Sequence, residues 1–276
     1  MTLSILLEVY PWLPYYAFGV GIIIGSFLNV VIYRFHTGRS INGHSHCMSC
    51  GERLRWFELF PLLSFLCLRG RCRTCSCRIT PRYALVEFLT GALFTLSLFA
   101  ASTTYELLFL WLIMSVLVVI TVYDINHYII PDKLVLMLTL LVFAMQGYAV
   151  WLGSKSTVAL TEDFIYALAG AGFFLFLWVI SKGKWLGFGD VKLAFPLALI
   201  VGAPLVFSMV VFSFWIGTIV SLSLIGVAKL QRGKLGLRFT GQGLTIKSVV
   251  PFAPFLIAGC LLVFFTHINV ISIFSF

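Results

Sequence analysis

Charged residues are scarce in this 276-residue chain: only 11% of its residues are Asp, Glu, Lys or Arg, whereas 61% are hydrophobic. A soluble domain of this length needs far more polar surface, so the composition excludes an ordinary water-soluble protein. The formal net charge of +9 would suggest nucleic acid binding in a soluble protein. Here the basic residues lie between apolar runs, where they define membrane topology. We therefore expect a lipid bilayer, and no nucleic acid, as a partner.

Several other features are missing. There is no internal repeat, no low-complexity linker and no glycine-rich strand-to-helix fingerprint of a Rossmann cofactor site. No basic segment precedes the first apolar run and no small-residue cleavage site follows it, so we expect it to stay as an anchor. The missing inverted repeat and paired broken helices disfavour a carrier. A polytopic transporter with an intramembrane aspartate relay is nevertheless an alternative.

Apolar runs that approach the length needed to cross a hydrocarbon core, about 20 residues, dominate the chain. They lie near Leu13–Tyr33, Ala84–Ala101, Leu107–Tyr123, Leu134–Leu152, Phe164–Ser181, Leu205–Ala228 and Val249–His267, with a short additional run at Leu193–Ala203. If the short run also crosses, loops 34–83, 124–133, 182–192 and 229–248 share one side and hold 18 of the 19 Lys and Arg residues. The positive-inside rule then favours eight spans, with these loops cytoplasmic and both termini outside.

These patterns predict an all-α polytopic membrane protein of about eight transmembrane helices. Residues 1–33 form the first helix, residues 34–83 a small cytoplasmic domain, and residues 84–276 a core of the remaining helices. The cytoplasmic segment carries nine arginines and one apolar stretch, Phe60–Leu68. That stretch is too short to span a membrane, so we expect it to pack on the membrane surface or on the helices.

Four of the seven cysteines form two Cys-x-x-Cys pairs within residues 34–83: Cys47 with Cys50, and Cys72 with Cys75. The pairs are separated by 21 residues, which is close to the spacing of tetrathiolate zinc sites. A cytoplasmic location favours reduced, metal-binding thiols over disulfides. We therefore predict a structural zinc, which would stabilise a segment that has little core of its own. Three nearby side chains are alternative ligands: Cys77, His44 and His46.

Acidic residues number only ten, and two of them lie at predicted cytoplasmic boundaries. Asp124 directly follows the third apolar run, and Asp190 precedes the short sixth run within Gly-Phe-Gly-Asp-Val-Lys. Two carboxylates that meet can share one proton, because like charges about 3 Å apart cannot both ionise easily, and such a pair activates water against a peptide carbonyl. Gly187 and Gly189 would let the backbone approach a substrate closely.

The residues alone also allow a simpler interpretation of each acid. Asp190 is placed where it can be the N-cap of the sixth helix, and Asp132, which follows Pro131, is better explained as a helix cap than as a catalyst. An acid near a membrane boundary needs no catalytic role, because it lies close to water. Spacing alone therefore allows two interpretations of Asp124 and Asp190: a catalytic pair, or two unrelated carboxylates at helix ends.

Five segments, in this order, resemble the motifs of the bacterial prepilin peptidases: Gly25–Arg34, Arg82–Glu87, Asp124–Asp132, Gly187–Lys192 and Pro251–Phe255. Prepilin peptidases belong to the intramembrane aspartyl proteases with a Gly-x-Gly-Asp motif, as do presenilin, signal peptide peptidase and the archaeal preflagellin peptidases. The resemblance implies that Asp124 and Asp190 are the catalytic pair. It also makes Gly187, Gly189 and Lys192 supporting or substrate-binding positions.

The same resemblance implies a substrate and a second activity. The family cleaves the leader of type IV prepilins and type II secretion pseudopilins at the cytoplasmic face of the bacterial inner membrane. The cysteine segment is similar to the cytoplasmic domain of the longer, bifunctional members, which also N-methylate the new N-terminus with S-adenosylmethionine. No residue is assigned to the methyl-donor site. Presenilin-like cleavage of other transmembrane helices is a further alternative. It is opposed by the two Cys-x-x-Cys turns, here called knuckles (Cys47–Cys50 and Cys72–Cys75), and by the first-helix motif Gly25–Arg34.

Three positions near the first two spans carry separate expectations. Gly21 and Gly25 are spaced as in a small-residue face of packed membrane helices. Asn29 is expected to form an interhelical hydrogen bond. Glu87 is interpreted either as an ion-pair partner of the basic loop or as part of a methyl-transfer site.

Overall fold

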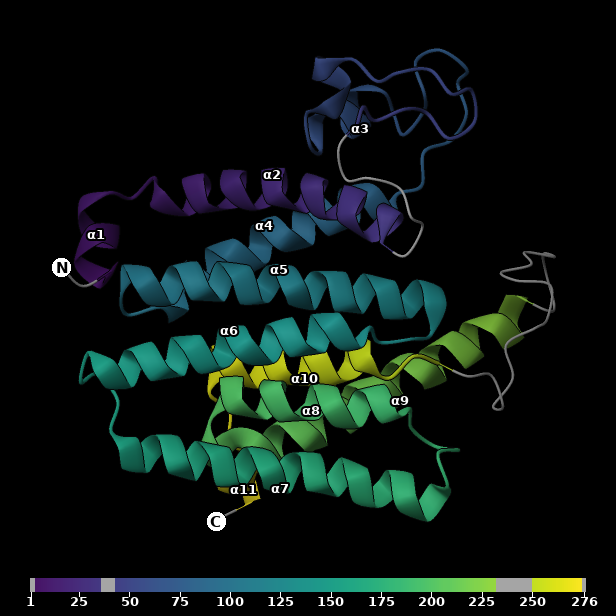
Figure 1. Cartoon of the computed structure of the whole chain (residues 1–276). Helices are drawn as coiled ribbons and strands as arrows, with labels where there is room; N and C mark the ends of the chain where they lie inside the picture. The colour runs from purple at the N-terminus through teal and green to yellow at the C-terminus, as the bar shows by residue number, and fades with distance from the viewer. Residues whose placement is uncertain (1–2, 36–42, 232–249, 275–276) are drawn as a thin grey trace. The chain divides into compact units, whose positions relative to one another are not determined.

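The computed structural model describes residues 3–35, 43–231 and 250–274, and Figure 1 shows that they are organised as helices and loops. Within these residues there is no β-strand, and the only strand-like pairs are two isolated bridges in the cysteine-bearing segment. The chain divides into two compact units, Met1–Val119 and Ile120–Phe276.

Among the described residues, six helices are long and apolar enough to cross a membrane: Leu13–Arg34, Arg82–Ala100, Thr104–His127, Asp132–Trp151, Thr157–Ser181 and Ala203–Val227. The prediction of an all-α polytopic membrane protein is therefore confirmed. Two further predicted spans are shorter helices of 14 residues, α8 at Phe188–Val201 and α10 at Ala253–Thr266. Each is about 21 Å long at 1.5 Å per residue, against a hydrocarbon core of about 30 Å. Helix length therefore supports six crossings, and the predicted total of eight stays a prediction.

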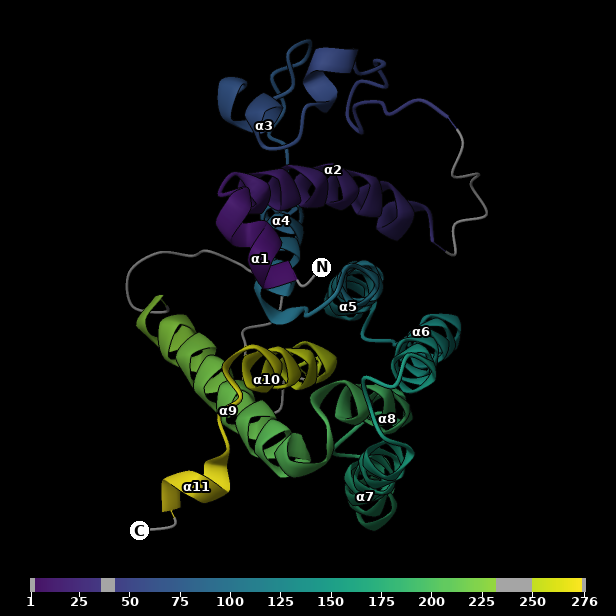
Figure 2. The ribbon, with the colours of Figure 1, turned by 90° about the vertical axis from the view of Figure 1, so that its left-hand side faces the viewer.

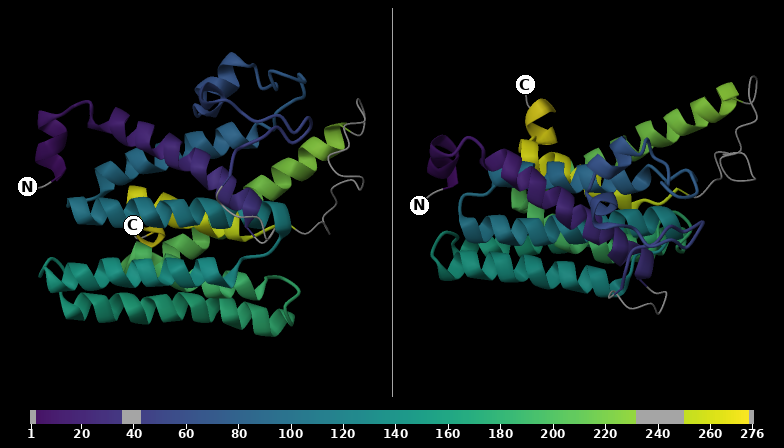
Figure 3. Two further views of the ribbon diagram at one scale, coloured as in Figure 1. Left: turned by 45° about the horizontal axis from the view of Figure 1, so that its top comes forward. Right: turned by 90° about the horizontal axis from the view of Figure 1, so that it is seen from above.

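In the first unit, α2 (Leu13–Arg34) packs against α4 (Arg82–Ala100), as Figures 1 and 3 show. The remaining elements of this unit are α1 at Leu3–Val9, η1 at Trp56–Leu59, α3 at Leu63–Cys67 and the first part of α5, which spans Thr104–His127. A Cβ added at Gly21 would lie 2.6 Å from Gly91 Cα, and one at Gly25 would lie 2.8 Å from Glu87 Cα. The predicted glycine packing face is confirmed, because only hydrogen fits between these backbones.

Polar groups hold the same two helices in register. Asn29 Nδ2 donates a hydrogen bond to the Tyr83 carbonyl at 3.1 Å, which confirms the predicted interhelical bond. The buried Glu87 accepts a hydrogen bond from the Leu62 backbone N–H at 2.8 Å and another from the Ser26 side chain. Among the described residues no ion pair involves Glu87. The carboxylate therefore anchors the apolar stretch Phe60–Leu68 to the helices instead of pairing with a described arginine.

In the second unit, α8 is the central helix. Figure 2, which looks along the helices, shows it enclosed by α6 (Asp132–Trp151), α7 (Thr157–Ser181), α9 (Val206–Gln231) and α10. Ten of the 14 residues of α8 are buried. A helix with protein on all sides is expected to be apolar around its whole circumference. Short elements η2 at Ala203–Leu205 and α11 at Val270–Phe274 complete the unit. Most of the predicted basic loop 229–248 and Val249 lie outside the described residues.

Two helix boundaries differ from the sequence-based expectation. Helix α5 continues past Tyr123 to His127 and ends where Tyr128 adopts a left-handed φ of 56°. Asp124 therefore lies inside the last turn of a helix and not just after it. Helix α8 starts at Phe188, five residues before the predicted apolar run, and its N-cap is Gly187. Asp190 is accordingly a first-turn residue, so the alternative prediction that it is the N-cap is wrong.

A buried polar network joins α6, α7 and the C-terminal end of α8. Lys155 Nζ donates to Gln146 Oε1 at 2.6 Å and forms an ion pair with Asp163. The other Asp163 oxygen accepts the Ala203 backbone N–H at 2.7 Å, just after α8 ends. Gln146 Nε2 donates to the Leu199 carbonyl at 3.2 Å. The network fixes the position of the C-terminal end of α8 against α6 and α7.

We expect Asp163→Asn to lower the free energy of unfolding by about 2 kcal/mol, because it leaves the partly buried Lys155 charge without its counter-charge. Thermal unfolding of the purified protein in detergent measures the change. The adjacent Glu162 is exposed, so Glu162→Gln is the matched control and should change the stability little. Equal stability of Asp163→Asn and the control would show that the network does not hold the end of α8.

Candidate active site and metal centre

Asp124 is a buried acid, only 4% exposed, on the last turn of α5. Its carboxylate accepts a hydrogen bond from the Ala253 backbone N–H at the start of α10. Its Oδ2 atom is buried and has no hydrogen-bond partner among the described residues. A buried polar atom is normally paired, so this oxygen is available to a water molecule or a substrate.

Asp190 is also buried, at 5% exposed, in the first turn of α8. Its Oδ2 accepts the Gly187 backbone N–H at 3.1 Å, which orients the carboxylate and caps the helix. Asp124 lies close enough to Asp190 for the two carboxylates to interact electrostatically. The structure thus brings together two acids that are 66 positions apart in the chain.

The two aspartate segments touch directly at Gly189. A Cβ added there would lie 3.0 Å from Ile130 Cβ and 3.2 Å from Ile130 Cδ1, which is closer than most real Cβ contacts. At Gly187 the nearest neighbour of an added Cβ would be Asp190 Oδ2, at 3.4 Å. The second glycine therefore provides the close approach between the loop after α5 and the start of α8, and the first lies against the Asp190 carboxylate.

Lys192 forms an ion pair with Asp132, its Nζ lying 2.8 Å from Asp132 Oδ1. Asp132 is the first residue of α6. The N-cap of this helix is Pro131, and no side chain caps it with a hydrogen bond. The prediction that Asp132 is a helix cap is therefore wrong. The pair joins the two aspartate segments a second time, but both side chains are partly or largely exposed, at 37% and 70%. An exposed pair contributes little stability.

The four predicted cysteine ligands meet in the first unit: the sulfurs of Cys47, Cys50, Cys72 and Cys75 all lie within 4.8 Å of one another. A zinc ion with Zn–S bonds of about 2.3 Å needs sulfurs about 3.8 Å apart in a tetrahedron. The Sγ atoms of Cys47 and Cys75 are 3.8 Å apart. All seven cysteines, each of which lies in a described part of the chain, are free thiols. The cluster has the ligand number and spacing to hold a metal ion.

Of the alternative ligands, only Cys77 comes close, with its Sγ 3.6 Å from that of Cys47. Neither His44 nor His46 belongs to the cluster that the described residues form. Backbone N–H groups of Cys50 and Ser49 point at the Cys47 sulfur and lower the pKa of this thiol to about 6. A thiolate is the form that binds metal, so the backbone around Cys47 favours this role for its sulfur.

In each knuckle the chain turns back through an equivalent backbone hydrogen bond. Gly51 N–H donates to the Cys47 carbonyl, and Ser76 N–H donates to the Cys72 carbonyl, both at 2.9 Å. Gly51 has a φ of +74°, and Ser76 has a φ of +55° at the equivalent position. A left-handed conformation is unfavourable for a residue with a Cβ. The second knuckle therefore carries backbone strain that the first avoids.

We expect Ser76→Gly to stabilise the metal-bound knuckle by about 1 kcal/mol, because glycine adopts the left-handed conformation without a steric penalty. Competition with a chelator for zinc measures the effect as a higher apparent affinity. Thr74 lies in the same knuckle without a positive φ, so Thr74→Gly is the control and should not raise the affinity. The same gain in both variants would remove the conformational explanation.

Two family models match the chain. The Bacterial Peptidase A24 N-terminal domain matches residues 20–101, and the Type IV leader peptidase family matches residues 111–222. The first match contains the cysteine cluster, α4 and the part of α2 from residue 20 onward. The second contains both buried aspartates.

Three curated relatives are named prepilin leader peptidase/N-methyltransferase. The protein of Klebsiella pneumoniae is 35% identical over 67% of this chain and 83% of its own length. That of Dichelobacter nodosus is 31% identical over 95% of this chain and 94% of its own length. That of Myxococcus xanthus is 45% identical, but the match covers 44% of this chain and 36% of that protein. No solved structure matches the chain. On these matches, the chain is a member of the type IV leader peptidase family.

Proposed function

We propose that this protein cleaves the leader peptide from type IV prepilins or type II secretion pseudopilins with Asp124 and Asp190 as an aspartate pair. The observation that supports this most is the burial of two acids from separate helices close enough for the charge of Asp124 to act on Asp190. One oxygen of Asp124 also has no partner among the described residues. Relatives with matching sequence are named prepilin leader peptidases.

In the proposed reaction the pair shares one proton, as expected for two carboxylates in one site. The ionised carboxylate removes a proton from a water molecule, which attacks the scissile carbonyl. The protonated carboxylate donates a hydrogen bond to the carbonyl oxygen as negative charge develops there. Proton transfer to the leaving nitrogen then releases the leader. No side chain attacks the substrate, so we expect no acyl-enzyme.

The surrounding residues have supporting roles in this proposal. Gly187 orients the Asp190 carboxylate through its backbone N–H, and Gly189 allows the two aspartate segments to touch. Lys192 joins the segments through its ion pair with Asp132. The four cysteines would hold a structural zinc, which cross-links a segment with few buried apolar residues.

We further propose that the protein N-methylates the new N-terminus with S-adenosylmethionine, as the names of its relatives suggest. The proposed location is the bacterial inner membrane. The cysteine segment would be cytoplasmic and both termini periplasmic, since this arrangement leaves only Lys155 outside among the basic residues.

Mass spectrometry of a prepilin co-expressed with this protein tests both activities at once. We expect the recovered pilin to lack its leader and to carry one added methyl group on its N-terminus. A prepilin of unchanged mass, recovered beside correctly inserted and zinc-loaded protein, would contradict the proposal.

A further inference from the structure

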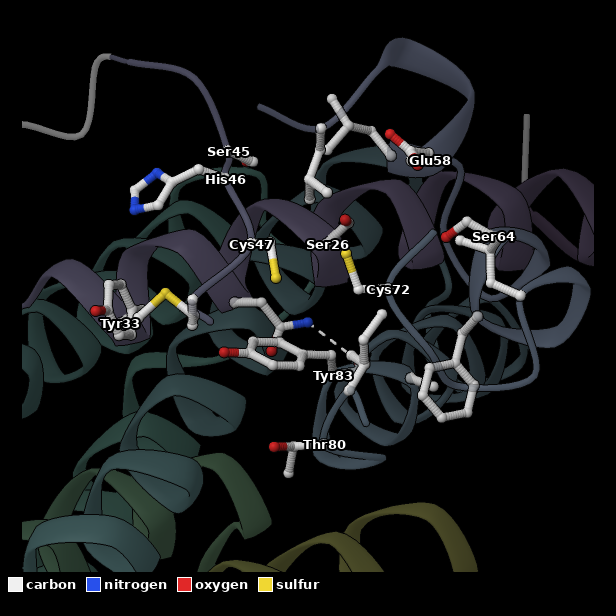
Figure 4. Close-up of a pocket in the computed structure, with 18 of the residues that line it drawn as sticks. Ser26, Tyr33, Ser45, His46, Cys47, Glu58, Ser64, Cys72, Thr80 and Tyr83 are labelled. Atoms are coloured by element: carbon white, nitrogen blue, oxygen red, sulfur yellow. Dashed lines mark hydrogen bonds between the residues drawn. The ribbon is translucent and has the colours of Figure 1, made fainter. Parts of the chain in front are cut away.

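A cavity of about 500 Å³ lies within the first unit, between the cysteine-bearing segment and the ends of α2 and α4. Figure 4 shows side chains from these elements converging around it, among them Tyr33 from α2, Tyr83 from α4, and Cys47 and Cys72 from the two knuckles. The volume falls in the range of about 300–1,000 Å³ typical of small-molecule sites. The proposed peptidase chemistry uses none of its lining residues.

The wall of this cavity that α2 and α4 form is pre-organised. Gly25 brings the two helices into backbone contact at Glu87, and the Asn29–Tyr83 hydrogen bond fixes their ends. Asn29, Tyr83 and Glu87 all line the cavity. A wall held by direct backbone packing presents its polar groups without first having to become ordered, which favours ligand binding.

The cavity has a buried negative charge on one wall and exposed positive charges elsewhere in its lining. Glu87 is only 8% exposed and, among the described residues, has hydrogen-bond donors but no cation to balance it. A buried carboxylate without a counter-charge is unfavourable, so the site favours a ligand with positive charge. Two exposed arginines, Arg73 and Arg78, also line the cavity and offer positive charge for an anionic group.

Aromatic and small polar groups occupy the remaining wall. Tyr33 and Tyr83 line the cavity, and an aromatic ring can contact a flat heterocycle or a cation, as the Tyr83 ring does with the Arg82 guanidinium at 5.5 Å. Ser26, Asn29 and Thr80 offer hydrogen-bonding groups. The lining thus combines a buried anion, exposed cations, aromatic faces and hydrogen-bond donors and acceptors.

We propose that this cavity is the binding site of S-adenosylmethionine, an inference that rests on the N-methyltransferase function proposed above. The ligand carries a sulfonium and an ammonium, a carboxylate, and an adenine ring. These groups match the Glu87 carboxylate, the exposed arginines and the tyrosine rings, respectively. When bound, the ligand supplies the methyl group for the pilin N-terminus. Such a site would need no glycine-rich nucleotide loop, in agreement with the absence of that motif from the sequence.

Filling the cavity provides the first test. Ala84 lines the cavity, whereas the next residue, Leu85, points outward and is 56% exposed. Ala84→Phe should reduce the affinity for S-adenosylmethionine by at least about tenfold, because the new ring occupies the binding volume. Leu85→Phe is the matched control and should bind like the wild type. Isothermal titration calorimetry of the intact zinc-loaded protein in detergent measures both, and the melting temperature of each variant reports its folding.

Replacing the buried charge provides the second test. Glu87→Gln keeps an acceptor for the Leu62 N–H but removes the negative charge, so the affinity for S-adenosylmethionine should fall by about tenfold. Glu106→Gln is the matched control, because Glu106 accepts the Ser102 backbone N–H at 2.8 Å in the same unit but does not line the cavity. This control should bind like the wild type.

The outcomes separate the two proposals. Wild-type protein that methylates prepilin, together with unchanged binding by Ala84→Phe and Glu87→Gln, would overturn the assignment of this cavity and leave the methyltransferase function standing. Wild-type protein that removes the leader but neither binds the ligand nor adds a methyl group would overturn the methyltransferase function itself. Selective loss of binding in the two cavity variants, with both controls intact, supports the assignment.

Discussion

Asp124→Asn and Asp190→Asn are each expected to reduce prepilin cleavage by about 10³-fold, within the range of about 10²–10⁴ typical for loss of a general acid or base. Asparagine retains the shape of aspartate and can accept the Ala253 or Gly187 backbone N–H, but it cannot take a proton from water. Cleavage of a purified prepilin in detergent, followed as appearance of the free leader, measures the rate. The fold should be retained, so the melting temperature and zinc content should stay close to those of the wild type.

Asp132→Asn serves as the comparison, because Asp132 belongs to the same aspartate segment. Its ion pair with Lys192 is largely exposed, and exposed pairs contribute at most about 1 kcal/mol, which corresponds to less than a tenfold change. We therefore expect a much smaller loss of cleavage from this variant. Wild-type cleavage by either Asp124→Asn or Asp190→Asn would eliminate the aspartate pair as the catalytic group.

Gly189→Val is expected to reduce cleavage by about 10²-fold, the effect of displacing catalytic groups by about 1 Å. An added Cβ already comes within 3.0 Å of Ile130 Cβ, and the two methyl groups of valine cannot be accommodated without separating the loop from α8. Because Asp124 and Asp190 lie on the two segments that meet here, their separation would weaken the pairing. Initial rates at saturating prepilin measure the loss.

Ile130 provides a rescue experiment. If Gly189→Val acts by steric displacement, Ile130→Ala in the same protein should restore a substantial part of the cleavage rate. Gly172→Val on α7 is the control, because nothing lies within 4 Å of a Cβ added at Gly172, and it should cleave like the wild type. No recovery in the Gly189→Val, Ile130→Ala double variant would assign Gly189 a role other than close packing.

Much of the fold follows from local properties of the sequence. Long apolar runs predict α2, α4, α5, α6, α7 and α9, because a membrane span needs continuous hydrophobicity. The spacing of Gly21 and Gly25 predicts a close helix contact, and the structure identifies Gly91 as part of the partner surface. The Cys-x-x-Cys spacing similarly predicts the sulfur cluster, because each knuckle is a local turn.

Other features do not follow from the hydrophobic pattern. The apolar run begins after Asp190, whereas α8 starts at Phe188, where the Asp190 carboxylate accepts the Gly187 backbone N–H. The Lys155–Asp163 pair was not predicted, since nothing local relates a loop lysine to an acid within an apolar helix. The same holds for the cavity beside Glu87, whose wall combines three separate segments.

The central claim is that Asp124 and Asp190 act as one unit, and the cleavage rate of the Asp124→Asn, Asp190→Asn double variant tests it most directly. Groups that act together are not additive, so the double variant should retain the same residual rate as either single variant. A double variant whose loss equals the product of the two single losses would show that the aspartates act independently, and would contradict the account.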